Sequence, residues 1–522
     1  MSKFDPQPQA LSRREFMAKA AALGLTATAA NLIWAEAGLA ETPKKGGHFV
    51  LGLTGGESTN SLDPALSASH VTAKALRAYG NTLTVVTADG GIAPSLAASW
   101  EANEDGKVWT FLIRKGVEFH NGKTLTPEDV QQTLARHSNE ESQSGALGIM
   151  RGIEDVRVDG DYVVITLTTP NADLPYLMSD YHLVMQPGGG IDNPGEGVST
   201  GAYKVTADEP GVRYAFEKFA NHWDENVGHY DSHEILVLND DTARSAALQA
   251  GQVHAINVVP PRTAKLFGRA PGVTINATSG RGHYIFVMHT DTAPFDNKDL
   301  RLALKYAINR EELVDKVLRG FGSVGNDIPI NEAYPLFDAS MEQRQFDLAK
   351  AAEHYKASGH DRTPIVLHVS DAAFAGALDA AQLFQLSAQA AGIPLEIQRE
   401  PADGYWSEVW NNKPFCASYW GGRPVQDQMW SVGYLSTADW NDTNFKNEEF
   451  DALVLKARAE LDTAKRKDIY AQMARIVWEE GGLINPMFNQ FIDGYSDKVA
   501  GWSAHANGDL MDGYVASRTW FA

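Results

Sequence analysis

The stretch DGKVWTFLIRKGVEFHNGKTLTPEDV, residues 105–130, holds a strand pattern and a helix start within one short segment. VWTFLI at 108–113 is rich in the β-branched and aromatic residues that favour a strand. Thr126 is followed by Pro127 and two acidic residues, which is typical of a helix that has Thr as its N-cap and Pro in its first turn. The segment therefore predicts a strand followed by a helix.

Similar strand patterns lie on both sides of this stretch in the first half of the chain. HFVLGL at 48–53 and YVVITL at 162–167 are predicted strands. The Gly/Pro-rich run PGGGIDNPGEGVSTG at 187–201 is the strongest candidate for a boundary in this half.

The second half of the chain alternates strands and helices more regularly. The predicted strands are HYIFVM at 283–288, PIVLHV at 364–369, PLEIQ at 394–398 and FCASYW at 415–420. The predicted helices are one with apolar residues from Leu300 to Ile308 on one face and an end at Gly320, two near 347–357 and 376–391, and two amphipathic helices around 450–457 and 469–477. This order predicts an α/β fold with a mostly parallel sheet.

Length and charge limit the classes of protein and partner. The 522 residues exceed what a single hydrophobic core supports, so two or three domains are expected. The 66 acidic and 45 basic residues give a net charge of −21. Binding to nucleic acid or to an anionic membrane surface usually needs clustered Lys and Arg, so neither is an expected partner.

The N-terminus has the features of an export signal in the expected order. SRREFM at 12–17 contains an arginine pair, and an Ala-rich apolar run follows at 20–30. The pattern predicts a twin-arginine signal peptide over residues 1–40, which the Tat export machinery would use and which would be cleaved near Ala37 or Ala40. The alternative is a basic amphipathic N-terminal helix.

The rest of the chain predicts a periplasmic product without an anchor. No Cys stands directly after the predicted leader, so no lipid anchor is expected there, and the lone Cys416 cannot form an internal disulfide. No later apolar run approaches the length needed to span a bilayer. We therefore expect a protein that is free in the periplasm.

No enzyme motif is complete in this sequence. It lacks both a phosphate loop and a G-x-S-x-G nucleophile elbow. The dipeptide HE at 233–234 begins like H-E-x-x-H, but residue 237 is Val. His229 and His233 are therefore interpreted as surface or loop histidines and not as a zinc pair. We expect a protein that is not an enzyme and that has neither a metal site nor a cofactor.

A second stretch, YWGGRPVQDQMW at 419–430, combines aromatic rings, two glycines and both signs of charge. It begins where the predicted strand FCASYW ends, and in open α/β sheets ligands bind beyond the carboxyl ends of the strands. Tyr419 and Trp420 offer large rigid contact surfaces, whereas Gly421 and Gly422 let backbone N–H groups approach a ligand. The stretch is therefore predicted to form part of a binding site.

The charged residues of this stretch suit a small ligand. Arg423 has the planar guanidinium that binds a carboxylate or phosphate, and Asp427 offers a partner for an amine. The alternative is that Arg423 and Asp427 pair with each other while Trp420 and Trp430 fill the core. We favour the core position for Trp430, and we expect Trp420 and Arg423 to contact the ligand.

Several segments follow one another in the order found in one protein family. They are KGGHFVLGL, SLDPALSAS, LAASWEANEDGKVWTFLIRKGVEFHNGKTLTPEDV, STGAYKV, FANHW, HEILVLNDDTARSAALQAGQVHAINVVP and PFDNKDLRLALKYAINREELVDKVLRGFG. Over nearly the whole chain after the predicted leader, the sequence resembles the family 5 extracellular solute-binding proteins, the dipeptide, oligopeptide and nickel type that serve ABC importers. The stretch quoted first is the most specific part of the resemblance.

The resemblance implies a two-lobed, clam-like periplasmic-binding-protein fold of the α/β class, with an extra subdomain inserted in the first lobe. Lobe I would comprise residues 41–75, 198–282 and 490–522. The inserted subdomain would comprise residues 76–197, and lobe II residues 283–489.

The resemblance also places further segments near the cleft between the lobes. It implies that FCASYWGG supplies part of the pocket wall. The segments 55–63 and 280–288 would lie near the cleft, which makes Glu57 and Tyr284 candidate ligand contacts. His289, which stands where the family usually has Asn, is a third candidate.

This sequence departs from the family pattern at positions that bear on the ligand. Peptide-binding relatives usually carry acidic residues soon after the matching Trp, one of which takes the peptide amine, whereas Gly421, Gly422, Arg423 and Pro424 stand here. His254 stands where Asp is usual. An Arg that faces the cleft repels an ammonium group and attracts an anion. We therefore expect a peptide-like or amino-acid-derived ligand with a carboxylate, such as an opine-like compound, and not a simple dipeptide.

The expected mechanism is capture of one ligand by closure of the lobes, which would rotate about crossing segments near Gly280 and residues 488–495. Arg423 and Asp427 would pair the charges of the ligand as the cleft becomes dry. A monomeric closed form would then dock on the permease subunits of an ABC importer in the inner membrane. The alternatives are a periplasmic hydrolase of peptides or conjugates, the same fold with a metal chelate or haem as cargo, and delivery of the ligand to a sensory receptor.

Overall fold

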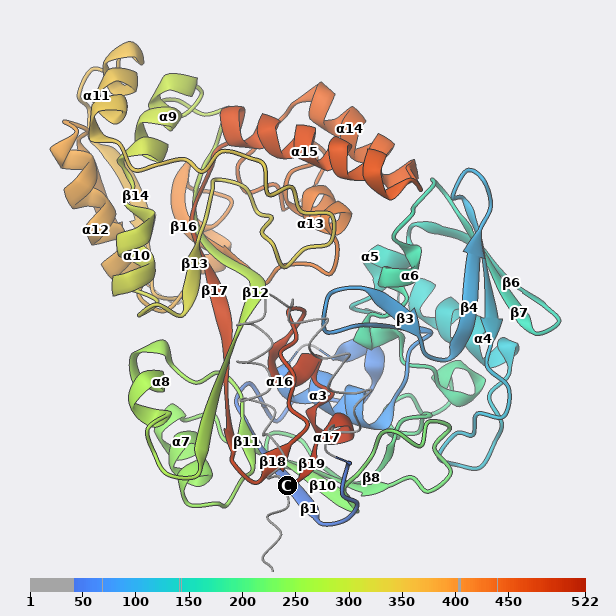
Figure 1. The fold of residues 1–522 in the computed structure, drawn as a ribbon. Helices are drawn as coiled ribbons and strands as arrows, with labels where there is room; N and C mark the ends of the chain where they lie inside the picture. Colours follow the sequence, from blue (N-terminus) through green and yellow to red (C-terminus); the bar gives the residue numbers. More distant parts are fainter. Residues whose placement is uncertain (1–41, 68, 140, 142, 402–404, 439) are drawn as a thin grey trace, which may run out of the picture.

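The protein has two lobes joined by a pair of long strands (Figure 1). The computed structural model describes residues 42–522 except 68, 140, 142, 402–404 and 439. The predicted signal peptide at 1–40 lies outside the described residues. Within the described part of the chain, no helix has the length and apolar character needed to cross a membrane.

One sheet extends through both lobes, and its two longest strands are β12 (Val273–Met288) and β17 (Leu483–Ser496), which pair with each other. Its strand order is β15-β14-β16-β12-β17-β11-β1-β10-β9-β8, and β13 also pairs with β17. The other strands are β1 (His48–Leu53), β8 (Tyr203–Glu209), β9 (Arg213–Lys218), β10 (Ser232–Val237), β11 (Ala255–Ile256), β13 (Gly322–Val324), β14 (Ile365–Val369), β15 (Leu395–Arg399) and β16 (Phe415–Trp420).

This sheet is mixed, so the prediction of a mostly parallel sheet is wrong. β14 pairs in parallel with β15 and β16, as the alternation of strands and helices predicts. β12, however, runs antiparallel to both β16 and β17. β12 carries the chain into the upper lobe of Figure 1 and β17 carries it back, so the two crossing strands point in opposite directions.

The stretch quoted first folds as predicted, in a separate antiparallel sheet. Its strand is β5 (Val108–Ile113), and its helix is α4 (Pro127–Ser138), whose N-cap Thr126 accepts from the backbone N–H of Asp129. The sheet has the order β4-β5-β7-β6, with β4 (Ala97–Ala102), β6 (Ile153–Asp159) and β7 (Tyr162–Leu167). Beside it lie β2 (Thr84–Val86), β3 (Ile92–Pro94), α5 (Leu147–Met150), α6 (Leu174–Leu177), η3 (Tyr181–Leu183) and η4 (Pro187–Gly190).

The upper lobe has its own hydrophobic core, formed by residues between Ile285 and Met487. The predicted helix that ends at Gly320 is two helices here, so that prediction is wrong. α9 (Lys298–Ala307) ends where Ile308 becomes extended, and Asn309 then caps α10 (Arg310–Lys316) by accepting from the N–H of Glu312. The other helices of this lobe are α11 (Leu348–Ala357), α12 (Ala377–Ala390), α13 (Gln426–Gly433), α14 (Glu448–Ala459) and α15 (Thr463–Glu480).

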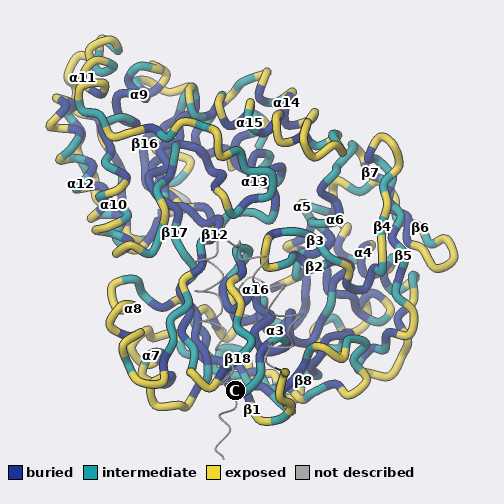
Figure 2. The backbone as a smooth tube through the Cα atoms, in the orientation of Figure 1, coloured by how far each residue is buried: buried dark blue, intermediate teal, exposed yellow. Residues whose placement is uncertain are grey.

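The lower part of the molecule contains both the first strand and the last elements of the chain (Figure 1). Figure 2 shows that buried residues concentrate along the strands of the long sheet, whereas the outer helices α7, α11 and α12 carry many exposed residues. The remaining elements are η1 (Pro64–Leu66), α3 (His70–Tyr79), α7 (Asp241–Gln249), α8 (Pro261–Phe267), β18 (Val499–Ala500), α16 (Asp509–Asp512), α17 (Val515–Arg518) and β19 (Trp520–Phe521).

His229 and His233 are both buried, so a surface position is wrong for both, whereas His229 does lie in a loop, as predicted. His233 lies in β10, where its ring stacks on Phe216 with 4.2 Å between centroids. His229 lies edge-on to Trp520. The aromatic neighbours exclude water, and burial lowers the pKa of His233 to about 3. No group of three or more His, Cys, Asp or Glu within the described residues is placed to hold a metal ion.

Candidate ligand-binding site

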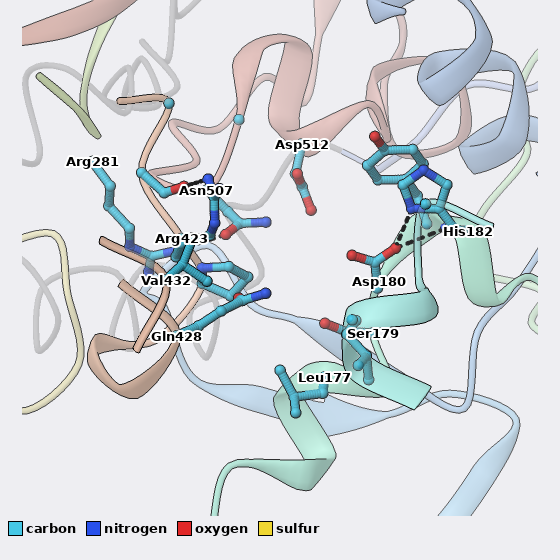
Figure 3. A pocket seen from close by; sticks show the side chains of 18 of the residues that line it. Leu177, Ser179, Asp180, His182, Arg281, Arg423, Gln428, Val432, Asn507 and Asp512 are labelled. Carbon is cyan, nitrogen blue, oxygen red and sulfur yellow. Dashed lines mark hydrogen bonds and ion pairs between the residues drawn. The ribbon is translucent and has the colours of Figure 1, made fainter. Parts of the chain in front are cut away.

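A cavity of about 890 Å³ lies where residues of both lobes meet, and its size suits a small molecule. Its walls come from α3, from the segments around α5, α6 and η3, from β12 and β17, from the loop after β16 with α13, and from the segment around α16. Figure 3 shows Arg281, Arg423 and Asn507 on one side of the cavity, Asp180 and His182 on the other, and Asp512 between them.

The loop that follows β16 forms one wall of this cavity. Four predicted ligand contacts line it, namely Gly421, Gly422, Arg423 and Asp427. Gly422 has a φ of +81°, and a Cβ there would lie 2.5 Å from the Cβ of Arg281. Only glycine therefore lets the loop pack this closely on β12. A Cβ at Gly421, by contrast, would meet no atom within 4 Å.

Arg423 lines the cavity, and the described residues give it no carboxylate partner. Its Nη1 donates to the carbonyl of Gly422 at 2.7 Å, and its backbone N–H donates to the hydroxyl of Tyr334 at 3.0 Å. Its guanidinium lies 5.4 Å from the ring centroid of Trp420. Burial lowers the pKa of Arg423. A largely desolvated cation without an anionic partner favours the binding of an anion.

Asp427 forms an ion pair with Arg458. The alternative predicted from the sequence, in which Arg423 and Asp427 pair with each other, is therefore wrong. The Nε of Arg458 lies 3.1 and 3.2 Å from the two carboxylate oxygens of Asp427. The charge of Asp427 is thus already balanced inside the protein. Its role as the partner of a ligand amine remains a prediction.

The two aromatic residues at the end of β16 are not among the described residues that line the cavity. Trp420 is buried, and its indole N–H donates to Asp442 at 3.3 Å. It supports the site through its contact with Arg423. Tyr419 is 48% exposed. Trp430 is fully buried, which confirms its predicted core position.

Glu57, Tyr284 and His289 also lie outside the set of described residues that line the cavity, and their roles remain predictions. Glu57 is exposed in the segment after β1. Tyr284 stacks on Phe374 with 4.5 Å between ring centroids. His289 is buried just beyond the end of β12, and its backbone N–H donates to the carbonyl of Pro414.

Sequence reasoning missed the charged residues that α3 and the C-terminal segment bring to the cavity. Lys74 Nζ lies 2.5 Å from Asp509 Oδ1, and Arg77 Nη2 lies 3.4 Å from Asp512 Oδ2. Burial opposes ionisation of Asp509, but Lys74 and His70 more than offset it and hold the pKa of Asp509 well below its usual range. Lys74 and Asp509 are 435 positions apart, so no local pattern links them.

Arg281 on β12 is a further residue of the cavity that was not predicted from the sequence. It is 2% exposed and lines the cavity. Its Nε donates to the carbonyl of Ala333 at 2.9 Å, and its Nη1 donates to Asn507 Oδ1 at 2.6 Å. Its Nη2 is buried and has no hydrogen-bond partner. The only signal for this residue was its place in the segment 280–288, which the family resemblance puts near the cleft.

The backbone beside Asp512 adopts an uncommon conformation. Leu510, Met511 and Asp512 have φ values of +51°, +60° and +57°, and Gly513 follows at +83°. The left-handed conformation costs about 1–2 kcal/mol for each residue that carries a Cβ. The N–H of Leu510 donates to the buried Asp493 on β17 at 2.8 Å, which helps to hold the turn. Strain of this kind clusters at ligand sites.

The pairing of the two crossing strands is interrupted beside the cavity. The register of β12 against β17 shifts between Ser279 and His283. Gly280 lies in this interruption, and a Cβ there would lie 2.5 Å from the ring of Phe491, which lines the cavity. A break in the ladder at a close glycine contact is a place where paired strands bend.

Known proteins resemble this chain in sequence and in fold. The profile of the bacterial extracellular solute-binding proteins, family 5 Middle, matches residues 91–442. The glutathione-binding protein GsiB of Salmonella choleraesuis (strain SC-B67) is 23% identical over 471 residues, which cover 86% of this chain and 90% of that protein. GsiB of Escherichia coli (strain K12) is 23% identical over 431 residues, which cover 78% of this chain and 82% of that protein.

Two solved structures illustrate the likeness in fold. HbpA2 from Haemophilus parasuis has a TM-score of 0.80 at 18% identity, with 91% of this chain and 100% of that chain covered. AgaA from A. tumefaciens R10, in complex with agropinic acid, has a TM-score of 0.74 at 22% identity, with 91% and 99% covered. The two-lobed fold predicted from the sequence is confirmed by these likenesses. Because the family profile spans well over half of its length, this chain belongs to the bacterial extracellular solute-binding proteins of family 5.

Proposed function

We propose that this protein is the periplasmic substrate-binding component of an ABC importer. It captures a small peptide-like or amino-acid-derived ligand through a carboxylate and delivers it to a membrane permease. The observation that carries the proposal is the guanidinium of Arg423, which lines the cavity without a carboxylate partner among the described residues. A ligand carboxylate supplies that partner in the planar geometry that Arg binds best. The names of GsiB, a glutathione-binding protein, and of AgaA, in complex with agropinic acid, support a ligand of this class.

We further propose how the protein reaches the periplasm and captures its ligand there. The twin-arginine signal at 1–40 directs export, and the mature protein acts as a monomer in the periplasm. The lobes, with the boundaries predicted from the family resemblance, close by rotation about β12 and β17. The protein captures and releases its ligand without chemical turnover, as the family membership favours.

Mass spectrometry of the purified protein tests this function. The protein is purified without denaturant and then unfolded, so that any bound small molecule is released. We expect one carboxylate-bearing compound in about equal amount to the wild-type protein and its loss from Arg423→Ala. Arg262→Ala, which removes an exposed Arg outside the cavity, is the matched control and should retain the compound. A cavity that retains the compound in Arg423→Ala would contradict the proposal.

A further inference from the structure

Two of the cationic side chains that line the cavity have no ion-pair partner among the described residues. Each of the four lining carboxylates already has a basic partner in the protein. The pairs are Lys74–Asp509, Arg77–Asp512, Arg458–Asp427 and His182–Asp180. Within the described residues, neither Arg281 nor Arg423 forms an ion pair. The protein thus presents two guanidinium groups without an ion-pair partner to whatever fills the cavity.

Arg281 and Arg423 belong to the same wall, where they share a neighbour. The N–H of Arg423 donates to the hydroxyl of Tyr334, and the guanidinium of Arg281 lies 5.3 Å from the ring centroid of the same residue. Gly422, which precedes Arg423, packs directly on the main chain and Cβ of Arg281. Figure 3 shows both side chains on one side of the cavity. Their burial lowers both pKa values, as expected when cations lose water.

Resting on the proposed function, we infer that Arg281 and Arg423 together form one anion subsite, which takes a ligand end with two negative charges, such as a dicarboxylate or a phosphate monoester. A buried charge is tolerated when it is paired, and a single carboxylate would leave one guanidinium unpaired. Each guanidinium carries a fork of N–H donors, and the buried Nη2 of Arg281 still lacks an acceptor. Two negative charges complete both the charge balance and the hydrogen bonding of this wall.

Thermal unfolding in the presence of matched anions tests this subsite. The full protein is freed of bound small molecules by unfolding and refolding, and its melting temperature Tm is measured with glutarate against valerate and with phosphate against chloride, at equal ionic strength. Glutarate or phosphate should raise the Tm by about 2–5 °C more than its matched monoanion at saturating concentration. A response to glutarate alone identifies a dicarboxylate, and a response to phosphate alone identifies a phosphate monoester.

Variants then show whether the two guanidinium groups carry that response. Arg281→Gln and Arg423→Gln should each abolish the extra rise in Tm, whereas Arg262→Gln should keep it. Because Arg281 is almost fully buried, its variant could fail to fold, and a second pair of variants avoids this difficulty. Gly421 lines the cavity and has open space where a Cβ would lie, so Gly421→Asp supplies a counter-charge from within the protein. Compared with Gly421→Asn, it should raise the Tm of the empty protein and reduce the response to dianions.

The outcomes separate this inference from the proposed function. If valerate raises the Tm as much as glutarate, and phosphate does no more than chloride, the protein recognises a single carboxylate and the inference is overturned while the proposed function stands. The inference also fails if either Arg→Gln variant retains the full response, or if Gly421→Asp behaves like Gly421→Asn. If none of the four anions changes the Tm, the inference is overturned, and the search for a released carboxylate compound decides the proposed function separately.

Discussion

Asp173 at the start of α6 forms a buried ion pair with Arg466 of α15, and this pair joins the region of the separate antiparallel sheet to the upper lobe. The two side chains are 3% and 11% exposed. Close by, the N–H of Ala172 donates to the carbonyl of Arg458 at 2.8 Å. These contacts connect two sides of the ligand cavity, since α6 and Arg458 both contribute to its lining. They therefore hold the region of the antiparallel sheet against the upper lobe.

Replacing Asp173 should weaken this contact between the region of the antiparallel sheet and the upper lobe. Removing one partner of a buried ion pair typically costs about 3–5 kcal/mol, because the other charge stays buried and unpaired. In Asp173→Asn the lobes can avoid that cost by separating, so that Arg466 regains water. We expect a larger radius of gyration by small-angle X-ray scattering and a lower melting temperature. Asp155→Asn, at an exposed position on β6, should change neither quantity. An unchanged radius of gyration in Asp173→Asn would show that the Asp173–Arg466 pair does not hold the two parts together.

Asp442 should make the stability of the upper lobe depend on pH. Its carboxylate is buried, and its Oδ2 accepts indole N–H groups from Trp410 at 3.1 Å and Trp420 at 3.3 Å. Burial raises the pKa of Asp442 to about 7, and the two hydrogen bonds offset only part of this rise. A carboxyl whose pKa is higher in the folded state stabilises the protein below about pH 4, and this stability is lost as the pH rises towards 7.

The variant Asp442→Asn measures this effect because Asn keeps an acceptor for the indoles and cannot ionise. The free energy of unfolding of the variant, relative to wild type, should increase by on the order of 2–4 kcal/mol between pH 4 and pH 8. Urea unfolding at both pH values provides the measurement. A difference between variant and wild type that does not change with pH would show that Asp442 does not titrate in this range.

His233 should produce the opposite dependence on pH. Both of its ring nitrogens are buried without a hydrogen-bond partner, and burial lowers its pKa to about 3. When the pKa of a His is lower in the folded state, the protein loses stability as the pH falls below the pKa of that His in the unfolded state, which is about 6.5. His233→Phe keeps an aromatic ring against Phe216 and cannot be protonated. The free energy of unfolding of the variant, relative to wild type, should therefore be about 2 kcal/mol higher at pH 5 than at pH 8. An equal difference between variant and wild type at both pH values would contradict this reasoning.

The two glycines of the cavity wall should respond differently to a methyl group. Gly422→Ala places a Cβ against Arg281 at a positive φ, so we expect a loss of about 1–3 kcal/mol in the free energy of unfolding. Gly421→Ala, its neighbour in open space, should stay within about 0.5 kcal/mol of wild type. Denaturant unfolding of both variants tests the contrast. Equal losses would mean that the loop does not pack on β12 as described.

Local sequence chemistry predicted those elements whose signals lie within a few residues. Thr126 and Pro127 marked the start of α4, and the end of β16 placed Arg423 on a cavity wall, because strand ends in an α/β sheet face the ligand. The break after Ala307 was missed because the apolar pattern continues through Ile308 while the Asn309 side chain starts a new helix.

Contacts between distant segments could not be predicted in this way. Lys74 and Asp509 form an ion pair although they are 435 positions apart in the sequence, and no local pattern around either residue identifies its partner. The position of Arg281 in the cavity wall depends on its tertiary contact with the loop that contains Gly422. The antiparallel direction of β12 and β17 likewise follows from how the chain crosses between the lobes and not from the composition of either strand.

A crystal structure of the protein with its own co-purified compound would show directly what Arg423 binds. We expect a carboxylate or another anionic group of that compound within hydrogen-bond distance of the guanidinium of Arg423 in the cavity. An ammonium group or an uncharged part of the compound beside Arg423, with the anionic group elsewhere, would contradict it.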